Sequence, residues 1–552
     1  MSNKNNKDKQ DLSPGISKES FDKGATALPG QAPLNLVDYK YKPEELEEGI
    51  FPEKDIYKAL DENEVGDATL MIKLFKGQRL YDQRANPNAA WYYWNDHYWR
   101  EDEQKEIFLL VNKVVALYYE QRRKEEYRLD RLSLQKLSQE EQQRIEKDLK
   151  VKIKKLRERE QLLLTLKRRS SILKLASMGV NSMGYVGDSW DQDPWLLGCK
   201  NGVINLRTGV RRDGQPDDYI KTVCPVKWDD SATCPRWEQF FLEIFEDDQE
   251  IVNFMQRLFG YAVTGLREEH IYPILWGPHG RNGKGTIFET LKMILGPMAC
   301  RASTQMIMQG IQQKSTGPNA GLMKMRGARI SWTSEAGKRD TIDTAVVKAL
   351  SGGDTITARN PFDRKETEFK PSHTLFTLTN PLPKVDADDD AFWTRVILIP
   401  FNLSYVDKPD AGKPWERLKN PKLENELKKE LPGILKWLVQ GTLMWRKQGL
   451  NIPKKLTTAK SKYRDSEDII QHFLQERCVV DFSEEVQEKI TMTIKPKLLY
   501  QEYKEWCNGA GFKTLNQKNF HSTIQKKIGE PGVLHGYRYY KGIAFKDSSD
   551  EV

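Results

Sequence analysis

Residues 271–286 read IYPILWGPHGRNGKGT, an apolar run followed by a glycine-rich turn and a lysine. The run contains strand-forming residues and ends at Gly277, and Lys284 stands close before the helix-forming sequence IFETLKMILG. Backbone N–H groups of such a turn point inward and bind anions, and the positive end of the following helix adds to the attraction. The pattern predicts a phosphate-binding loop in which Lys284 reaches the β- and γ-phosphates of a nucleoside triphosphate.

The loop departs at two positions from the strict pattern G-x-x-x-x-G-K-[ST]. Gly277 lies seven residues before Lys284 instead of six, and Gly285 stands where Ser or Thr is usual, so Thr286 would supply the hydroxyl for Mg²⁺. The alternative is a glycine-rich turn that binds no nucleotide. The residues predicted to bind ATP are Gly280, Asn282, Gly283, Lys284, Gly285 and Thr286.

The composition is that of a globular protein of several domains. The 552 residues suffice for about three or four domains of ~150 residues each. Charged residues make up 30% and hydrophobic residues 38% of the chain. No apolar run approaches the ~18 residues of a membrane span, and the N-terminus lacks the apolar core of a secretory signal, so we expect no membrane association. The six scattered cysteines form no C-x-x-C pair, which favours free thiols over a zinc site.

The positive charge is concentrated near the C-terminus. The chain has a formal net charge of +8, and residues 491–546 alone contain ten Lys or Arg against three Glu. This local excess indicates a module that binds a polyanion. Two helix-forming runs at 496–511 and 515–529 precede a hairpin pattern that turns near 541–542 or 535–536, the order of elements in a winged helix. The residues predicted to contact DNA there are Lys518, Lys526, Lys527 and Arg538.

Patterning predicts six segments along the chain. The sequence around 91–99 suggests a small aromatic hairpin turning at 95–96, with a core role favoured over base stacking, and 104–177 suggests a long helix or a helical hairpin. Residues 196–209 read as two short strands. The expected segments are a disordered tail at 1–35, a mixed α+β N-terminal domain with long charged helices at 36–225, a helical lead-in at 226–265, an α/β nucleotide-binding core at 266–402, a helical segment at 403–465 and a winged helix at 466–552.

Three further residues are candidates for the nucleotide site. Glu335 ends the apolar run at 329–334 and Asn380 ends another at 373–379, positions at which a carboxylate organises Mg²⁺ and an amide holds water or the γ-phosphate. Arg395 precedes the apolar run at 396–401 and is a candidate arginine finger for a neighbouring subunit. Taken singly, Glu335 is equally well explained as a surface residue, Asn380 has the alternative of a turn residue before Pro381, and Arg395 is better explained as a surface residue. Their order and spacing together favour the functional interpretation.

A basic hairpin lies between the acid and the amide. Strand-forming runs at 355–362 and 366–373 flank a tip that contains Arg364 and Lys365. Such a tip can project into a ring pore and grip a phosphate backbone. The alternative is an exposed hairpin with a charged tip.

These motifs together resemble superfamily III helicases of the phage and plasmid primase-helicase type, which are related to the poxvirus primase-helicase. The resemblance covers roughly residues 90–550 and follows the family order of motifs. It rests on GRNGKGT at 280–286, SE at 334–335, LSGGDTITAR at 350–359, LTNPLP at 378–383 and WTRVILIPF at 393–401, with LLGCKNGVINLRTG at 196–209, PRWEQFF at 235–241 and FMQRLFGYAVTG at 254–265 leading into them.

The resemblance implies an AAA+ core in a hexameric ring that uses ATP and Mg²⁺ to move 3′ to 5′ on single-stranded or forked DNA. It implies that Lys284 binds the phosphates, Thr286 and Glu335 bind Mg²⁺, Glu335 is the catalytic acid, Asn380 is the sensor and Arg395 is the finger given in trans. It also implies replication of a phage, plasmid or other mobile element in the bacterial host cytoplasm. Fewer than 100 residues precede Trp91, so we expect no primer synthesis and a separate primase as partner.

A non-catalytic DNA-binding initiator or scaffold that retains the ATPase fold is the alternative. The irregular loop and the basic C-terminal region favour it, whereas the joint presence of Lys284, Glu335 and Arg395 favours the helicase. A packaging or resistance ATPase has no support beyond the loop itself.

Overall fold

The computed structural model describes residues 51–83, 89–185, 187, 189–310, 319–334, 337, 340–361, 366–483, 492–512, 514–534 and 536–546. The chain forms two compact units, one of residues 1–76 and 103–182 and the other of residues 77–102 and 183–552. The N-terminal domain predicted at 36–225 therefore spans parts of both units, and the predicted segment bounds stay predictions. The tail predicted to be disordered at 1–35 lies outside the described residues.

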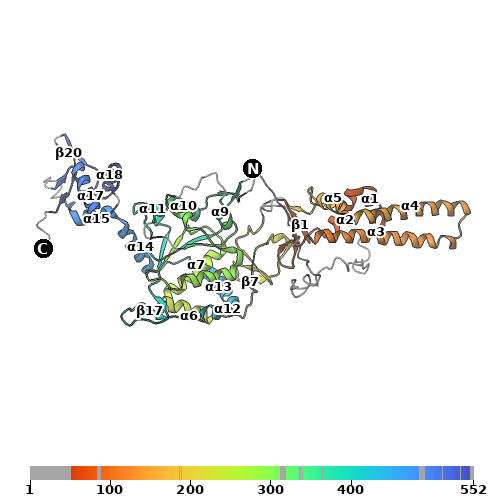
Figure 1. Ribbon diagram of the computed structural model, residues 1–552, viewed down its shortest axis with the longest axis horizontal. Coiled ribbons are helices and arrows are strands. Elements are labelled where there is room, and N and C mark those ends of the chain that lie inside the picture. The colour runs from red at the N-terminus through yellow and green to blue at the C-terminus, as the bar shows by residue number, and fades with distance from the viewer. Residues whose placement is uncertain are drawn as a thin grey trace, which may run out of the picture. The chain divides into compact units, whose positions relative to one another are not determined.

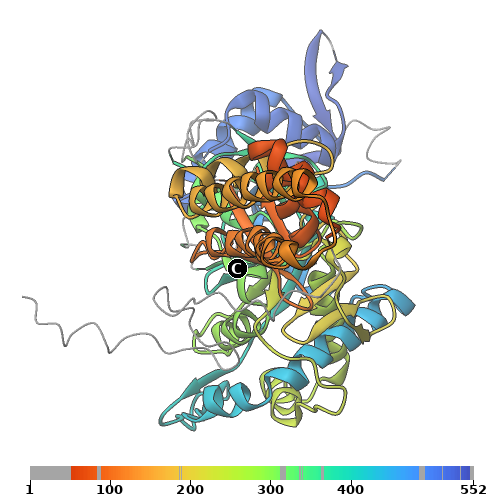
Figure 2. The same ribbon diagram turned by 90° about the vertical axis from the view of Figure 1, so that its right-hand side faces the viewer.

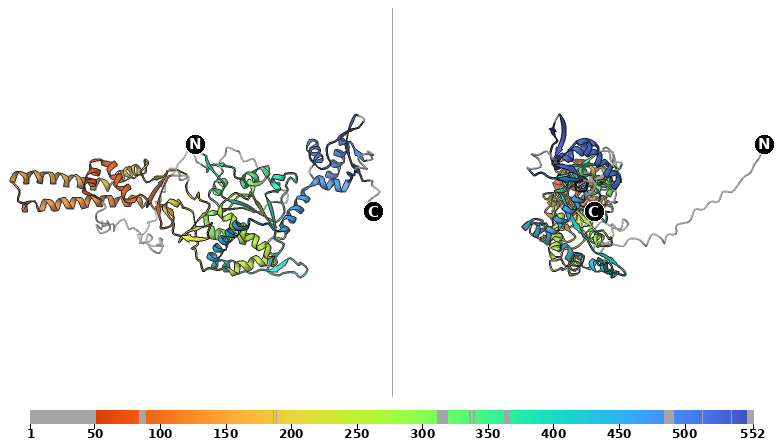
Figure 3. Two further views of the ribbon diagram at one scale, coloured as in Figure 1. Left: turned by 180° about the vertical axis from the view of Figure 1, so that it is seen from behind. Right: turned by 90° about the vertical axis from the view of Figure 1, so that its left-hand side faces the viewer.

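The described part of the first unit is helical. Figures 1 and 3 show its two longest helices, α3 and α4, side by side as an antiparallel hairpin, one of the two forms expected from the sequence. In α4, Leu149, Leu156 and Leu163 recur every seven residues and are buried. The elements of this unit are α1 (Glu53–Asp61), α2 (Asn63–Phe75), α3 (Ile107–Asp130), η3 (Leu132–Leu134), α4 (Gln139–Leu163) and α5 (Leu166–Ala176).

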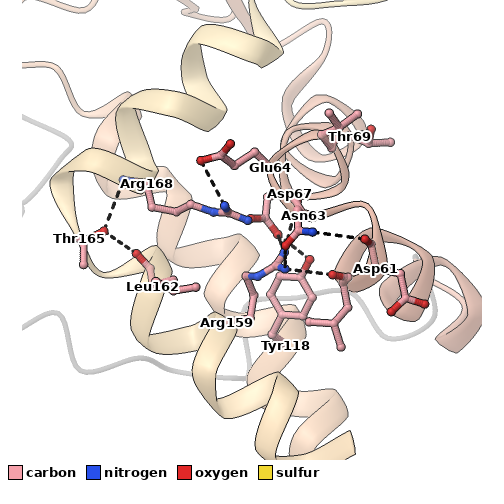
Figure 4. A network of polar contacts seen from close by, with 12 residues as sticks. Asp61, Asn63, Glu64, Asp67, Thr69, Tyr118, Arg159, Leu162, Thr165 and Arg168 are labelled. Atoms are coloured by element: carbon pink, nitrogen blue, oxygen red, sulfur yellow. Dashed lines mark hydrogen bonds and ion pairs between the residues drawn. The ribbon is translucent and has the colours of Figure 1, made fainter.

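A buried network of charges ties these helices together (Figure 4). The Asp67 carboxylate is fully buried and accepts hydrogen bonds from Arg159 at 2.8 Å and from the Tyr118 hydroxyl at 2.7 Å. Arg168 binds the other carboxylate oxygen at 2.6 Å and reaches Glu64 at 3.2 Å. A buried carboxylate is tolerated when it is paired and hydrogen-bonded in this way, so the network fixes how α2, α3, α4 and α5 pack.

The second unit begins with two small sheets. The predicted aromatic hairpin is confirmed, since Trp94 pairs with Trp99 across a turn in which Asp96 has φ 56°. Tyr92, Trp99 and Trp190 form a buried cluster, as expected for a core role. The first sheet, in the order β3-β2-β1-β4, contains β1 (Arg79–Asp82), β2 (Ala90–Trp94), β3 (Trp99–Glu101) and β4 (Gly184–Tyr185). The second, in the order β7-β6-β5-β8, contains β5 (Leu196–Cys199), β6 (Gly202–Asn205), β7 (Val210–Arg212) and β8 (Val223–Cys224), with η4 (Pro216–Asp218) before β8.

A five-stranded parallel sheet forms the centre of the second unit. Its order is β10-β11-β14-β9-β15, so the strand before the glycine-rich loop, β9, lies between two strands that follow it in sequence. A crevice forms at such a point beyond the carboxyl ends of the strands, where ligands of open α/β sheets bind. The strands are β9 (Tyr272–Trp276), β10 (Ala299–Arg301), β11 (Ile330–Ser334), β14 (Thr374–Thr379) and β15 (Val396–Pro400).

Helices cover both faces of this sheet, as Figure 1 shows with α7 and α13 on one side and α10 and α11 on the other. Alternate strand residues supply the two cores: Leu275 and Ile399 pack with the first layer, and Ile274 and Leu398 with the second. The helices around the sheet are α6 (Pro235–Ile244), α7 (Gln249–Thr264), α8 (Lys284–Leu295), η5 (Gly296–Met298), η6 (Thr304–Ile307), α9 (Ala320–Met325), α10 (Thr344–Ser351), α11 (Asp390–Trp393), α12 (Leu423–Lys429), α13 (Leu431–Gln448) and α14 (Lys454–Glu467).

Two short strand pairs accompany the sheet. The predicted hairpin between the acid and the amide is present as β12 (Ile356–Ala358) and β13 (Thr367–Phe369), which pair antiparallel. The segment predicted to be helical at 403–465 is so only from α12 onward. The segment starts instead with the parallel pair β16 (Ser404–Val406) and β17 (Glu416–Leu418). A backbone hydrogen bond from Tyr405 in β16 to Arg281 in the glycine-rich loop favours the extended conformation over a helix.

The C-terminal residues have their own core. The two predicted helices are present, and the hairpin turns between Leu534 and Tyr537 rather than at 541–542, because β22 pairs with β18 and not with β21. Figure 2 shows the β20–β21 hairpin (blue) projecting from these helices. The elements are α15 (Ile469–Arg477), β18 (Cys478–Val480), β19 (Thr493–Ile494), α17 (Pro496–Ala510), α18 (Gln517–Ile528), β20 (Gly532–Leu534), β21 (Tyr537–Lys541) and β22 (Ile543–Phe545).

Two general expectations concern membranes and thiols. None of the described helices is long and apolar enough to cross a lipid bilayer. All six cysteines are free and buried, and burial raises the thiol pKa of Cys224, Cys234 and Cys478 above its usual range. These thiols are therefore core residues with little thiolate character.

Candidate nucleotide site

The glycine-rich loop joins β9 to α8 at the carboxyl edge of the parallel sheet. Gly283 precedes α8 with φ +84°, a left-handed conformation that favours glycine, and a Cβ there would lie 3.0 Å from the ring of Phe240. The Gly277 N–H donates to the Thr379 carbonyl oxygen at 3.1 Å, and the Tyr405 N–H donates to the Arg281 carbonyl oxygen at 2.9 Å. The loop is thus held between the end of β14 on one side and the start of β16 on the other.

Lys284 and Asn380, both predicted site residues, come together at this edge. The Lys284 ammonium donates to the Asn380 side-chain oxygen over 3.1 Å, although the two residues are 96 positions apart. Lys284 is buried, with 6% of its surface exposed, and burial lowers its pKa to about 8. Asn380 is exposed and directly follows β14, the neighbour of β9. A cation at the first turn of a helix beside an amide is suited to hold a transferable phosphate.

Asn282 supplies an unused hydrogen-bond donor within the loop. Its side chain is 4% exposed, and its amide nitrogen has no hydrogen-bond partner among the described residues. A Cβ built on Gly277 would lie only 1.7 Å from that nitrogen and 2.6 Å from the Lys284 ammonium, so only glycine leaves room for both. A buried donor without a partner is costly, and a phosphate oxygen would satisfy it. The residues present therefore fit a triphosphate.

Position 285 is open. A Cβ at Gly285 would meet nothing within 4 Å, and Thr286 follows on the first turn of α8. Mg²⁺ prefers oxygen ligands and keeps several waters, so one hydroxyl and one carboxylate would suffice from the protein. The carboxylate candidate, Glu335, lies outside the described residues. β11 ends at Ser334, which pairs with Leu378 at the edge where β9 and β14 also end.

Arg395 lies at the amino-terminal end of the parallel strands, whereas the glycine-rich loop lies at their carboxyl end. It precedes β15, its carbonyl oxygen accepts from the Tyr272 N–H at 2.7 Å, and β15 runs parallel to β9 from Tyr272 to Trp276. Its guanidinium donates to the Ala391 carbonyl oxygen, and its buried Nε atom has no partner among the described residues. The structure does not bring Arg395 to Lys284 within one chain.

The predicted DNA contacts differ in their surroundings. Lys518 and Lys526 on α18 and Arg538 on β21 are exposed, whereas Lys527 is partly buried and forms an ion pair with Asp468. Arg364 and Lys365 lie outside the described residues. Lys527 is therefore better explained as a link between α18 and α15 than as a phosphate contact.

Two aromatic groupings were missed by the sequence reasoning. The Lys495 ammonium lies 5.1 Å from the ring centroid of Tyr537 and 5.7 Å from that of Tyr539. The His279 ring in the loop stacks on Trp415, with centroids 4.6 Å apart and planes 9° apart. Neither pairing has a local sequence signal, since strand pairing brings the partners together.

The titration of Lys284 has a consequence for stability. Because its pKa is lowered to about 8, the folded protein loses this proton before the unfolded chain does, whose lysines titrate near 10.4. We expect wild type to gain stability over Lys284→Met by roughly 1.4 kcal/mol per pH unit between about pH 8 and 10. Denaturant unfolding of both proteins from pH 7 to 10 measures this difference, and parallel pH profiles would contradict it.

Two regions of the chain match known family models. Residues 68–246 match the model described as D5 N terminal like, and residues 465–546 match the one described as Poxvirus D5 protein-like. Both regions are thus of D5 type, and in the sequence they lie before and after the strands of the parallel sheet. Neither matched range includes the glycine-rich loop.

Curated relatives are named as putative helicases or putative primases of DNA viruses. "Putative helicase L207/L206" of Acanthamoeba polyphaga mimivirus is 30% identical over 61% of this chain and 36% of that protein. "Putative helicase 121R" of Invertebrate iridescent virus 3 is 24% identical over 94% of this chain and 58% of that protein. "Putative primase C962R" of African swine fever virus (strain Badajoz 1971 Vero-adapted) is 22% identical over 63% and 36%, respectively. The chain thus spans between about a third and three fifths of the length of these relatives.

Among solved structures, the A form apo structure of the NrS-1 C terminal region is similar to this chain. It covers 68% of this chain and 89% of its own chain, with 16% sequence identity and a TM-score of 0.41.

Proposed function

We propose that this protein is an ATP-dependent DNA helicase of superfamily III with an AAA+ core. The observation that carries the proposal is the convergence of Lys284 and Asn380, 3.1 Å apart, at the topological switch point of the parallel sheet. The Asn282 amide nitrogen in the same loop, which has no partner within the described part of the chain, supports a phosphate ligand. The D5-type regions and the relatives named as helicases support DNA as the polymer on which the ATPase acts.

A ring assembly accounts for the position of Arg395. This residue lies at the amino-terminal end of the strands and Lys284 at their carboxyl end, so Arg395 cannot serve the nucleotide site of its own chain. A head-to-tail interface would bring it to the site of a neighbour, and such interfaces form a ring where the rotation between subunits closes. We propose a hexamer on the resemblance to superfamily III, with 3′-to-5′ movement on single-stranded DNA.

Thr286 and Glu335 would hold Mg²⁺, which neutralises phosphate charge. We expect Thr286→Ala to raise the Mg²⁺ concentration for half-maximal ATPase about tenfold or more, since even outer partners of metal ligands contribute on that order.

The open space at Gly285 offers a matched rescue. Adding Gly285→Ser to Thr286→Ala should restore most of the Mg²⁺ response, because the serine hydroxyl would take the usual position. Gly285→Ala with Thr286→Ala is the control that adds the same Cβ without an oxygen. Equal behaviour of these two double variants would remove the metal role from this helix turn.

The C-terminal module is the proposed DNA-binding winged helix. Lys518, Lys526 and Arg538 are exposed on α18 and β21 and are available to phosphates. The tip at 364–365 remains the proposed contact in the ring pore. A separate primase remains a proposed partner.

The scaffold alternative makes a different prediction about turnover. A helicase hydrolyses ATP faster when single-stranded DNA is added, whereas a scaffold binds DNA without accelerated hydrolysis. Measuring ATP hydrolysis with and without single-stranded DNA separates the two. DNA binding without any ATP hydrolysis would overturn the helicase proposal in favour of the scaffold.

A further inference from the structure

We propose that His279 and Trp415 form the binding platform for the nucleobase of the nucleoside triphosphate. This inference rests on the proposed function, because it requires that the glycine-rich loop binds the phosphates. It assigns the part of the ligand that neither the loop nor the strand-end residues address.

The platform is built from a stacked pair beside the loop. The rings of His279 and Trp415 are nearly parallel, with 9° between their planes and 4.6 Å between their centroids. His279 is exposed even though one face of its imidazole lies on Trp415. We place the base on the other face of this imidazole, where it would extend the stack by one more flat ring.

Backbone hydrogen bonds fix this pair to the phosphate loop. The Ser404 N–H donates to the Trp415 carbonyl oxygen at 2.8 Å, and the next residue, Tyr405, donates to the Arg281 carbonyl oxygen at 2.9 Å. His279 itself lies between Gly277 and Gly280 of the loop. The platform is thus tied through β16 to the loop that would hold the phosphates, and precise positioning of one ligand requires such support.

The chemistry of the ligand matches this arrangement. A nucleobase is joined to its phosphates through a single ribose, so it must lie next to the loop that holds them. Aromatic side chains bind bases through their π faces with little dependence on base identity. The platform should therefore favour purines modestly, through their larger stacking area, without selecting adenine absolutely.

The test compares ATP with inorganic triphosphate, which lacks a base. Binding of both is measured by calorimetry on the full chain in the presence of Mg²⁺. His279→Ala removes the ring that the base contacts and should weaken ATP binding by about 5- to 100-fold, the range expected for losing one stacking contact. Trp415→Ala removes the ring on which His279 is stacked and should also weaken ATP binding, because the imidazole is then no longer held in place. Binding of inorganic triphosphate should stay within about twofold of wild type, since the phosphate loop is intact.

Two control variants guard against a disturbed fold. Trp415→Phe keeps an aromatic face and should bind ATP within about threefold of wild type. Leu418→Ala changes an exposed residue of β17, the strand that begins directly after Trp415, and should leave both ligands unaffected. If both controls lose ATP affinity to the same extent as Trp415→Ala, the loss comes from a disturbed β17 rather than from stacking, and this result overturns the proposal.

The remaining outcomes are also decisive. Unchanged ATP binding in both alanine variants overturns the platform, as does an equal loss of ATP and inorganic triphosphate. Weaker binding of single-stranded DNA with unchanged ATP binding would assign the pair to a DNA base and also overturn it. Lys284→Ala is measured alongside: if it leaves inorganic triphosphate binding unchanged, the proposed nucleotide site itself fails, independently of Trp415.

Discussion

Lys284→Ala is expected to reduce ATP hydrolysis by a factor on the order of 10²–10³, because the variant removes a preorganised positive charge from the proposed phosphate site. Lys284 is buried at the start of α8, and its ammonium lies on Asn380 and close to Gly277. The measurement is steady-state phosphate release at saturating ATP.

Lys292→Ala is the matched control for this variant. Lys292 lies on the same helix, carries the same charge and is exposed near the other end of α8. Its loss should leave hydrolysis near the wild-type rate. Wild-type turnover in Lys284→Ala, with a purified protein of unchanged circular dichroism, would contradict the site assignment.

Arg395→Ala is expected to lower ATP hydrolysis by a factor on the order of 10³–10⁵, the contribution of arginine fingers to phosphoryl transfer. ATP binding should persist, because Arg395 lies at the far edge of the sheet from the loop. Its Nε atom is buried without a partner among the described residues, so a ligand supplied by a neighbour would satisfy it. The rates of wild type and variant are compared at equal ATP occupancy.

Mixing two inactive variants tests whether Arg395 acts in trans. Lys284→Ala keeps the finger and lacks the site, whereas Arg395→Ala keeps the site and lacks the finger. In an equal mixture about one ring interface in four joins an intact site to an intact finger. We expect hydrolysis to recover toward that fraction after the subunits exchange. A mixture as inactive as its parts would place the finger elsewhere.

The sequence predicted the parts of the site that local patterns encode. A strand followed by glycines and a lysine predicts its own geometry, and Asn380 could be placed because parallel strands end at a common edge. The arrangement of Lys284 against Asn380 followed from these two strand ends. The roles of Glu335, Arg364 and Lys365 stay predictions.

Contacts between distant segments were beyond the sequence. Trp415 reaches the loop only because β16 and β17 pair, and these strands lie in a segment that the sequence predicted to be helical. Lys527 was taken for a DNA contact because its partner, Asp468, lies 59 positions away. The two-unit division arises in the same way, since β1 pairs with β4 across a hundred residues.

The bacterial host compartment also stays a prediction.

Strand displacement on a forked DNA duplex tests the central claim most directly. The wild-type protein, Lys284→Ala and Lys292→Ala are each incubated with a fork labelled on one strand, with Mg²⁺ and with or without ATP. The account predicts that wild type and Lys292→Ala release the labelled strand only with ATP, and that Lys284→Ala binds the fork but releases none. Release without ATP, or release by Lys284→Ala at the wild-type rate, would contradict it.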